Sequence, residues 1–218
     1  MLKSLKTDDG SLTLYSDIFQ DTYHSRHGAL TESIHVFIEN GLAYKANSQQ
    51  TLKVGEIGLG TGLNAMLSFQ FAQRNQIRIA YSAIEAFPIS NEIKTELIAD
   101  YQIFNSEIYA QILQQTATGI IELASYFSFQ WFENKWPESQ PFTDLDILFY
   151  DAFAPNTQPE LWDEKAMNTA FSVLKSGGIL VTYCAKAYVR RNLIAAGFKV
   201  ERLPGPPGKF EMIRAVKS

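Results

Sequence analysis

The chain has 218 residues, of which 46% are hydrophobic and 19% are charged, and its formal net charge is −4. These values are ordinary for one folded globular domain and argue mildly against a protein coated with nucleic acid. Its single cysteine, Cys184, excludes an intrachain disulfide and a cysteine cluster that could hold zinc. No stretch approaches the roughly 20 apolar residues of a membrane span. We therefore expect a cytoplasmic protein without membrane contact.

Positive charge is concentrated toward the C-terminal end. Residues 184–218 contain eight basic and two acidic side chains, although the whole chain is net negative. Such an asymmetry indicates a polyanionic partner. A solvated helix and hairpin explains the same pattern equally well, so the charge alone leaves both interpretations open.

The N-terminal part predicts an extension ahead of the main fold. Residues 10–20 alternate loosely between apolar and polar side chains, which indicates a strand or one arm of a hairpin. Residues 28–41 predict a short helix that is opened by Thr31 and stopped by Gly41.

Strands and helices then alternate along the chain. We expect strands at 51–57, 77–85, 144–151 and 177–184, helices at 63–75, 90–101, 159–175 and 187–197, and one further helix and strand between 106 and 132. Two short strands, 198–204 and 210–218, follow without a helix between them, which implies an antiparallel pairing. The pattern predicts one α/β domain over residues 1–218, with a Rossmann-like, mostly parallel, doubly wound sheet. Residues 1–50 would form a β/α extension that covers the site.

In such a sheet, ligands bind at the carboxyl ends of the strands. The site should therefore lie on the loops after Ile57, Ile84, Phe149 and Tyr183.

Three glycines in EIGLGTGLNA, residues 56–65, connect the first strand of this series to a helix. Gly58, Gly60 and Gly62 permit a tight turn and leave the backbone open to a ligand. Gly60, Gly62 and Ala65 also satisfy the dinucleotide pattern G-x-G-x-x-A, so the turn alone does not distinguish a methyltransferase from a nicotinamide enzyme.

Two further features favour a methyltransferase. Glu56 precedes the glycines in the order E-x-G-x-G-x-G, which is usual for Rossmann-like methyltransferases that bind S-adenosylmethionine. The hairpin at the C-terminus also differs from dinucleotide domains, which usually continue with parallel strands. Glu85 ends the second strand, where a carboxylate can bind two ribose hydroxyls, but either class of enzyme places an acid there.

A carboxylate that could act on the substrate follows another strand. In ILFYDAFAPNTQPELW, residues 147–162, an apolar strand ends at Asp151. The prolines of the following loop fix its course. An amine must lose a proton before it can attack a methyl group, and Asp151 could hold the amine and accept that proton. Asp151 could instead cap the loop or bind only the cofactor.

Four blocks of sequence together resemble the methyltransferase domain of the MnmC family, which acts in the biosynthesis of 5-methylaminomethyl-2-thiouridine in tRNA. The blocks are residues 9–42, 56–65, 151–162 and 183–215, in this order, and they cover nearly the whole chain. The second block is shared by many methyltransferases, whereas the other three are long and characteristic of this family.

The resemblance implies transfer of a methyl group from S-adenosyl-L-methionine to the aminomethyl nitrogen of a wobble uridine in the anticodon stem-loop. Bifunctional members carry an additional FAD-dependent domain, for which 218 residues leave no room, so we expect no FAD. It also implies that Asp151 is the catalytic residue, an acidic side chain at the reaction centre. The cofactor would be held by Glu56, Gly58, Gly60, Gly62, Asn64, Glu85, Glu32, Tyr23 and Glu133, with Asn134 an alternative to Glu133.

Contacts with tRNA would come from basic and aromatic side chains. We expect these to be Phe153, Lys186, Arg190, Arg191 and Lys209. The three histidines lack metal-ligand spacing, so no metal is expected, and Cys184 is expected to pack rather than react. A methyltransferase acting on a small amine and a nicotinamide-dependent oxidoreductase remain as alternatives.

Overall fold

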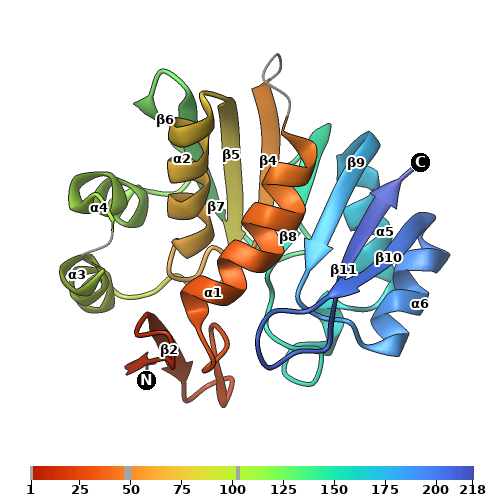
Figure 1. The fold of residues 1–218 in the computed structure, drawn as a ribbon, viewed down its shortest axis with the longest axis horizontal. Coiled ribbons are helices and arrows are strands. Elements are labelled where there is room, and N and C mark those ends of the chain that lie inside the picture. Colours follow the sequence, from red (N-terminus) through yellow and green to blue (C-terminus); the bar gives the residue numbers. More distant parts are fainter. Residues whose placement is uncertain (1, 47–50, 102–103) are drawn as a thin grey trace.

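The computed structural model describes residues 2–46, 51–101 and 104–218. Its centre is an eight-stranded sheet (Figure 1). The strands are β4 (Thr51–Ile57), β5 (Arg78–Glu85), β6 (Ile121–Ala124), β7 (Phe127–Glu133), β8 (Leu145–Tyr150), β9 (Leu174–Thr182), β10 (Phe198–Pro204) and β11 (Glu211–Lys217). Their spatial order is β10-β11-β9-β8-β4-β5-β7-β6.

The five central strands, from β9 to β7, are parallel to one another. β11 is antiparallel to both β9 and β10. At the other edge, β6 is antiparallel to β7. The expected doubly wound sheet with an antiparallel C-terminal hairpin is confirmed, and the antiparallel β6 is an addition that the sequence did not indicate.

Helices cover both faces of the sheet, which explains why its central strands are apolar on both sides. All six residues of β8 are buried. Phe149 packs in a core on the face covered by α2, whereas its neighbour Leu148 packs in a second core with α5 and α6. The helices are α2 (Leu63–Asn75), α3 (Asn91–Asp100), α4 (Ser106–Gln114), the short η2 (Pro159–Leu161), α5 (Glu164–Val173) and α6 (Ala187–Ala195). In the ranges that the structure describes, no helix combines the length and apolarity needed to cross a bilayer.

The N-terminal residues form a small antiparallel sheet followed by a helix. The strands are β1 (Leu2–Lys6), β2 (Leu12–Ser16) and β3 (Asp21–Thr22). Helix α1 (Ala29–Ser33) then continues directly into η1 (Ile34–Ala43), which has the wider turns of a π-helix. Figure 1 shows this small sheet at the end of the molecule toward which β4 and β9 run, so it lies near the carboxyl ends of the parallel strands.

The helix boundary predicted at Gly41 is wrong, because η1 extends to Ala43. A Cβ on Gly41 would lie 3.0 Å from the ring of Phe149 and 3.2 Å from the side chain of Val181. Glycine is therefore needed here for close packing of the helix on the sheet, and not for a helix stop.

Candidate functional site

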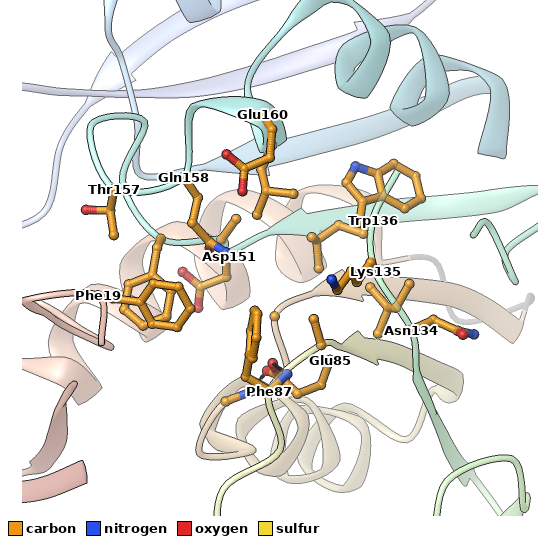
Figure 2. Close-up of a pocket in the computed structure, with 18 of the residues that line it drawn as sticks. Phe19, Glu85, Phe87, Asn134, Lys135, Trp136, Asp151, Thr157, Gln158 and Glu160 are labelled. Carbon is orange, nitrogen blue, oxygen red and sulfur yellow. Dashed lines mark hydrogen bonds between the residues drawn. The ribbon is translucent and has the colours of Figure 1, made fainter. Parts of the chain in front are cut away.

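A cavity of about 330 Å³ opens at the carboxyl ends of β4, β5 and β8. Figure 2 shows Asp151 and Glu85 in this cavity, with Phe19 on one side and Trp136 and Asn134 on the other. Of the residues predicted for the site, seven line the cavity: Tyr23, Gly58, Gly60, Glu85, Asp151, Phe153 and Asn134, the last as the alternative to Glu133. The carboxyl-end location expected from the alternation of strands and helices is thus where the structure has its cavity.

The glycine turn after β4 forms one wall of the cavity. The N–H of Gly58 donates to the carbonyl of Ile84 at 2.9 Å. A Cβ on Gly58 would lie 2.8 Å from the carbonyl oxygen of Asp151, and one on Gly60 would lie 3.0 Å from the ring of Tyr23. Both glycines also have left-handed φ angles, +89° and +51°. Any other residue would therefore fill the space between this turn and its neighbours.

Glu85 lies at the end of β5 and is fixed by the backbone. One carboxylate oxygen accepts from the N–H of Gly60 at 2.9 Å and the other from the N–H of Phe87 at 2.8 Å. Burial raises the pKa of Glu85, while these backbone hydrogen bonds oppose the increase. Because each carboxylate oxygen can accept more than one hydrogen bond, Glu85 can still bind hydroxyl groups of a ligand in the cavity.

Asn64, in the first turn of α2, connects two carboxylates. Its amide nitrogen donates to Glu56 at 2.9 Å and to Asp151 at 2.8 Å. Glu56 is completely buried, and both burial and the charge of Asp151 raise its pKa well above the ordinary value. The amide oxygen of Asn64 is buried without a hydrogen-bond partner among the described residues. Asn64 therefore connects the buried Glu56 to Asp151, the acid that lines the cavity.

Asp151 follows β8 directly and lines the cavity. Burial raises its pKa to about 7, and the negative charge of Glu32 adds to this increase. The hydrogen bond from Asn64 and the charge of Lys209 act in the opposite direction. Asp151 can therefore change its protonation state near neutral pH, as a general base requires.

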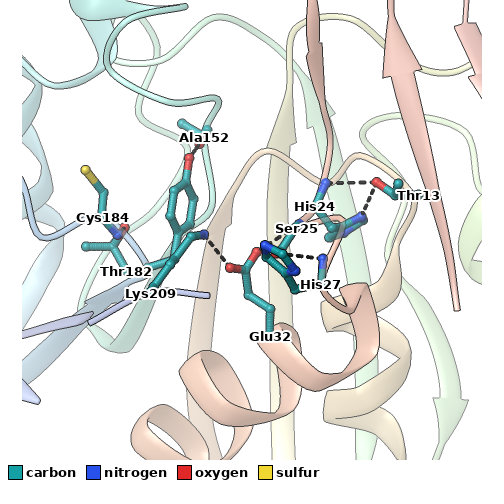
Figure 3. A network of polar contacts seen from close by, with 10 residues as sticks. Thr13, His24, Ser25, His27, Glu32, Ala152, Thr182, Cys184 and Lys209 are labelled. Carbon is teal, nitrogen blue, oxygen red and sulfur yellow. Dashed lines mark hydrogen bonds and ion pairs between the residues drawn. The ribbon is translucent and has the colours of Figure 1, made fainter. Parts of the chain in front are cut away.

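A network of polar contacts beside Asp151 joins the two ends of the chain (Figure 3). Glu32 of α1 forms an ion pair with Lys209 and also accepts a hydrogen bond from the N–H of Ser25 at 3.2 Å. The ammonium group of Lys209 lies 3.9 Å above the centre of the Tyr183 ring. The hydroxyl of Tyr183 donates to the carbonyl of Ala152 at 2.8 Å. Lys209 is thus held between the N-terminal extension and the loop that carries Asp151.

Aromatic side chains from three segments meet at the cavity. The rings of Phe19 and Phe153 are 4.5 Å apart, those of Phe19 and Phe87 are 5.2 Å apart, and those of Tyr23 and Phe153 are 5.0 Å apart. Sequence reasoning identified Tyr23 and Phe153 but missed Phe19, Phe87 and Trp136. Phe87 lies two residues after Glu85, and this closeness in sequence to a predicted cofactor ligand could have indicated that Phe87 also lines the site.

The remaining predicted residues lie around this cavity or away from it. Glu133 is exposed at the end of β7, whereas its neighbour Asn134 lines the cavity. The exposed Lys186 donates to the side chain of Asn156 at 2.6 Å. On α6, Arg190 is half-buried and Arg191 is exposed.

Cys184 is buried, and burial raises the pKa of its thiol. This environment suits a packing role, since a reactive cysteine needs a lowered pKa.

The chain is similar to known methyltransferases along most of its length. A family model described as S-adenosyl-L-methionine-dependent methyltransferase matches residues 131–218. The tRNA 5-methylaminomethyl-2-thiouridine biosynthesis bifunctional protein MnmC of Leptospira interrogans is 31% identical over 222 residues, an alignment that covers 93% of this chain. The chain spans only about a third of that relative, 33% of its length.

Two solved structures show the same fold. The crystal structure of MNMC2 from Aquifex aeolicus aligns with a TM-score of 0.81 at 24% identity, covering 100% of this chain and 71% of that one. Spermidine synthase from Thermotoga maritima aligns with a TM-score of 0.60 at 12% identity, covering 100% of this chain and 69% of that one.

Proposed function

We propose that this chain is an S-adenosyl-L-methionine-dependent methyltransferase that methylates an aminomethyl group on the wobble uridine of tRNA. The proposal is supported by the match of residues 131–218 to the model of that family and by the similarity of the chain to one third of the bifunctional protein MnmC. The name of the relative specifies the product 5-methylaminomethyl-2-thiouridine. The same base without the methyl group carries a primary amine. A methyltransferase that contributes to this product would therefore transfer the methyl group to the amine nitrogen.

The observation that carries this proposal is the environment of Asp151. Its carboxylate lines the cavity, accepts a hydrogen bond from Asn64 and has a pKa raised to about 7. A protonated amine has no lone pair and cannot attack a methyl group. A carboxylate whose pKa lies near the working pH is suited to accept the proton that the amine must lose.

The residues of the cavity fit S-adenosyl-L-methionine, which supplies a methyl group activated by its sulfonium centre. Its positive charges suit a cavity lined by the carboxyl groups of Glu85 and Asp151. Its ribose hydroxyls can donate to Glu85, which lines the cavity.

In the proposed reaction, the residues of this chain act mainly by positioning. Asp151 holds the amine by a hydrogen bond and accepts its proton, while Asn64 keeps the Asp151 carboxylate in one orientation. Alignment of the nucleophile with the methyl group can supply several kcal/mol of the rate enhancement, up to about 7–11 kcal/mol. The ring of Phe153, half-buried in the cavity wall, is placed to support the planar base of the substrate.

A nicotinamide-dependent oxidoreductase is less compatible with this site. In dinucleotide enzymes the backbone N–H groups at the glycine turn bind the pyrophosphate. Here the N–H of Gly60 already donates to the carboxylate of Glu85, so this N–H is not free for a pyrophosphate, and the charge of that carboxylate would repel one.

We propose that tRNA is the partner and that the anticodon stem-loop is the part bound. Lys209 borders the site beside Tyr183, while Lys186, Arg190 and Arg191 lie on the segment after β9. Such side chains bind phosphates without reading sequence. The reaction changes no oxidation state and uses an already activated methyl group, so we propose that it needs neither FAD nor a metal. We also propose that it takes place in the cytoplasm.

The test is incubation of the protein with methyl-labelled S-adenosyl-L-methionine and tRNA from a strain blocked at the aminomethyl stage. Nucleoside analysis should find the label in a 5-methylaminomethyl uridine. Transfer RNA that lacks the aminomethyl group is the control and should remain unlabelled. Label that appears in free small amines but not in tRNA would instead establish the small-amine alternative.

A further inference from the structure

Phe210 is an aromatic residue that the fold leaves in solvent. Its side chain is 101% exposed, although it lies immediately before β11, between Lys209 and Glu211. The ring contributes no packing to either of the two buried cores. Because the hydrophobic effect favours burial of such a ring, a ligand that covers it would gain binding free energy.

The turn that carries Phe210 is rigid. The N–H of Gly205 donates to the carbonyl of Phe210 at 3.0 Å, and the N–H of Lys209 donates to the carbonyl of Pro206 at 2.9 Å. Pro206 and Pro207 further restrict the backbone between these bonds. The backbone at Phe210 is therefore held in one conformation, so only the side-chain torsions need ordering when a ligand binds.

Contacts with the N-terminal extension fix where this turn lies. The imidazole Nε2 of His35 and the carbonyl oxygen of Pro204 form a hydrogen bond of 2.9 Å. A Cβ on Gly208 would collide with the ring of His27. Lys209, adjacent to Phe210, is paired with Glu32.

The turn also projects beyond the carboxyl edge of the sheet. Ile213 of β11 is paired with Thr182 at the end of β9, so residues 205–210 lie past that end. This is the edge at which the cavity opens. Phe210 itself does not line the cavity, whereas Phe19 and Phe153 do.

We infer that Phe210 is a stacking platform for a nucleotide base that flanks the reacting uridine. This inference rests on the proposed function. The cavity has its own aromatic rings for the reacting base, so a ring outside the cavity is placed for a neighbouring one. The face of an aromatic ring can stack on any of the four bases. The basic side chains of residues 184–218 favour an acidic partner over a neutral or basic one, and tRNA, the partner in the proposed function, is a polyanion.

The test compares four proteins: wild type, Phe210→Ala, Phe210→Leu and Phe210→Tyr. Binding of a labelled anticodon stem-loop is measured at one fixed salt concentration, followed by steady-state methylation of the aminomethyl tRNA. We expect Ala and Leu to weaken binding about tenfold, which corresponds to about 1.4 kcal/mol. Tyr should retain wild-type affinity because it keeps the ring. The loss should appear in KM for tRNA, with kcat and the affinity for the methyl donor unchanged.

Ile120→Ala is the matched control. Ile120 is also an exposed apolar side chain, 64% accessible, but it precedes β6 at the opposite edge of the sheet. It should leave tRNA binding unchanged. Equal affinities of wild type and Phe210→Ala would overturn the inference, as would a loss in Ala that Leu restores, since Leu keeps apolar bulk without a ring. A wild-type protein that does not methylate the tRNA would overturn the proposed function. The methylation assay of the wild type therefore distinguishes that failure from a failure of the inference about Phe210.

Discussion

Glu32 of α1 forms an ion pair with Lys209 of the turn before β11, across 177 positions of sequence. The two charges act on Asp151 in opposite directions, because the carboxylate of Glu32 raises its pKa and the ammonium of Lys209 lowers it. The pair thus joins the N-terminal extension to the C-terminal hairpin and also adjusts the acid at the centre of the site.

Replacing Glu32 by Gln should move the pH dependence of methyl transfer to lower pH. The ionised form of Asp151 is the active base, so kcat/KM should rise with pH as a pKa of about 7 is passed. Removing the negative charge of Glu32 favours that ionised form and lowers the pKa. The measurement is a pH profile of kcat/KM for wild type and variant.

Glu39→Gln is the control for this shift. Glu39 lies on η1, is mostly exposed and pairs with His35 at 3.5 Å. The variant should have the same midpoint as wild type. A midpoint for Glu32→Gln that stays in place, or moves to higher pH, would contradict the assigned role of Glu32.

Asp151→Asn should reduce methyl transfer by about 10²–10⁴-fold, because the amide cannot accept the proton of the amine. Binding of S-adenosyl-L-methionine should be largely retained, since the amide oxygen of the new residue can still accept the hydrogen bond from Asn64. Single-turnover transfer and calorimetric titration with the methyl donor separate the two effects. Asp100→Asn, at the exposed end of α3, is the control. Full activity in Asp151→Asn would exclude a role as base.

The parts of the site that could be predicted from the sequence are those set by local patterns. Gly60, Glu85 and Asp151 each follow a strand that is recognisable from its apolar run, and parallel strands bring their carboxyl ends to one edge. The order of strands and helices was therefore enough to group these residues before any contact was known.

Other parts depend on tertiary packing and left no local pattern. Phe19 lies in a loop of the N-terminal extension and reaches the cavity only because that extension folds over the edge of the sheet. Trp136 follows β7, and the sequence indicated only that some residue near the end of this strand would contact the adenine. Glu32 and Lys209 were assigned to different ligands, and nothing in their sequence surroundings indicates that they pair.

Asn64→Ala should weaken both the fold and the binding of the methyl donor. The substitution removes the hydrogen-bond donor of two carboxyl groups, Glu56 and Asp151, and the pKa of each should rise. Leaving such buried groups without a partner costs about 1–3 kcal/mol of unfolding free energy. Denaturant unfolding and donor titration measure the two losses.

Asn75→Ala, at the exposed end of the same helix, should change the unfolding free energy by less than about 0.5 kcal/mol. Equal stability of the two variants would count against the bridging role of Asn64.

Gly60→Ala should impair donor binding by a steric effect that can be separated from backbone strain. Gly60 has a φ of +51°, so alanine costs roughly 1 kcal/mol in backbone conformation alone. Its Cβ would also lie 3.0 Å from the ring of Tyr23, and the displaced turn would move the N–H from which Glu85 accepts a hydrogen bond.

Gly177→Ala supplies the control, because its φ is +75° but nothing lies within 4 Å of the added Cβ. Both variants should lose similar stability, whereas only Gly60→Ala should lose affinity for the methyl donor, by tenfold or more if the displaced turn costs about 1.4 kcal/mol. Adding Tyr23→Leu to Gly60→Ala should recover part of that affinity. If Gly177→Ala weakened donor binding as much, the loss would come from strain and not from the shape of the cavity wall.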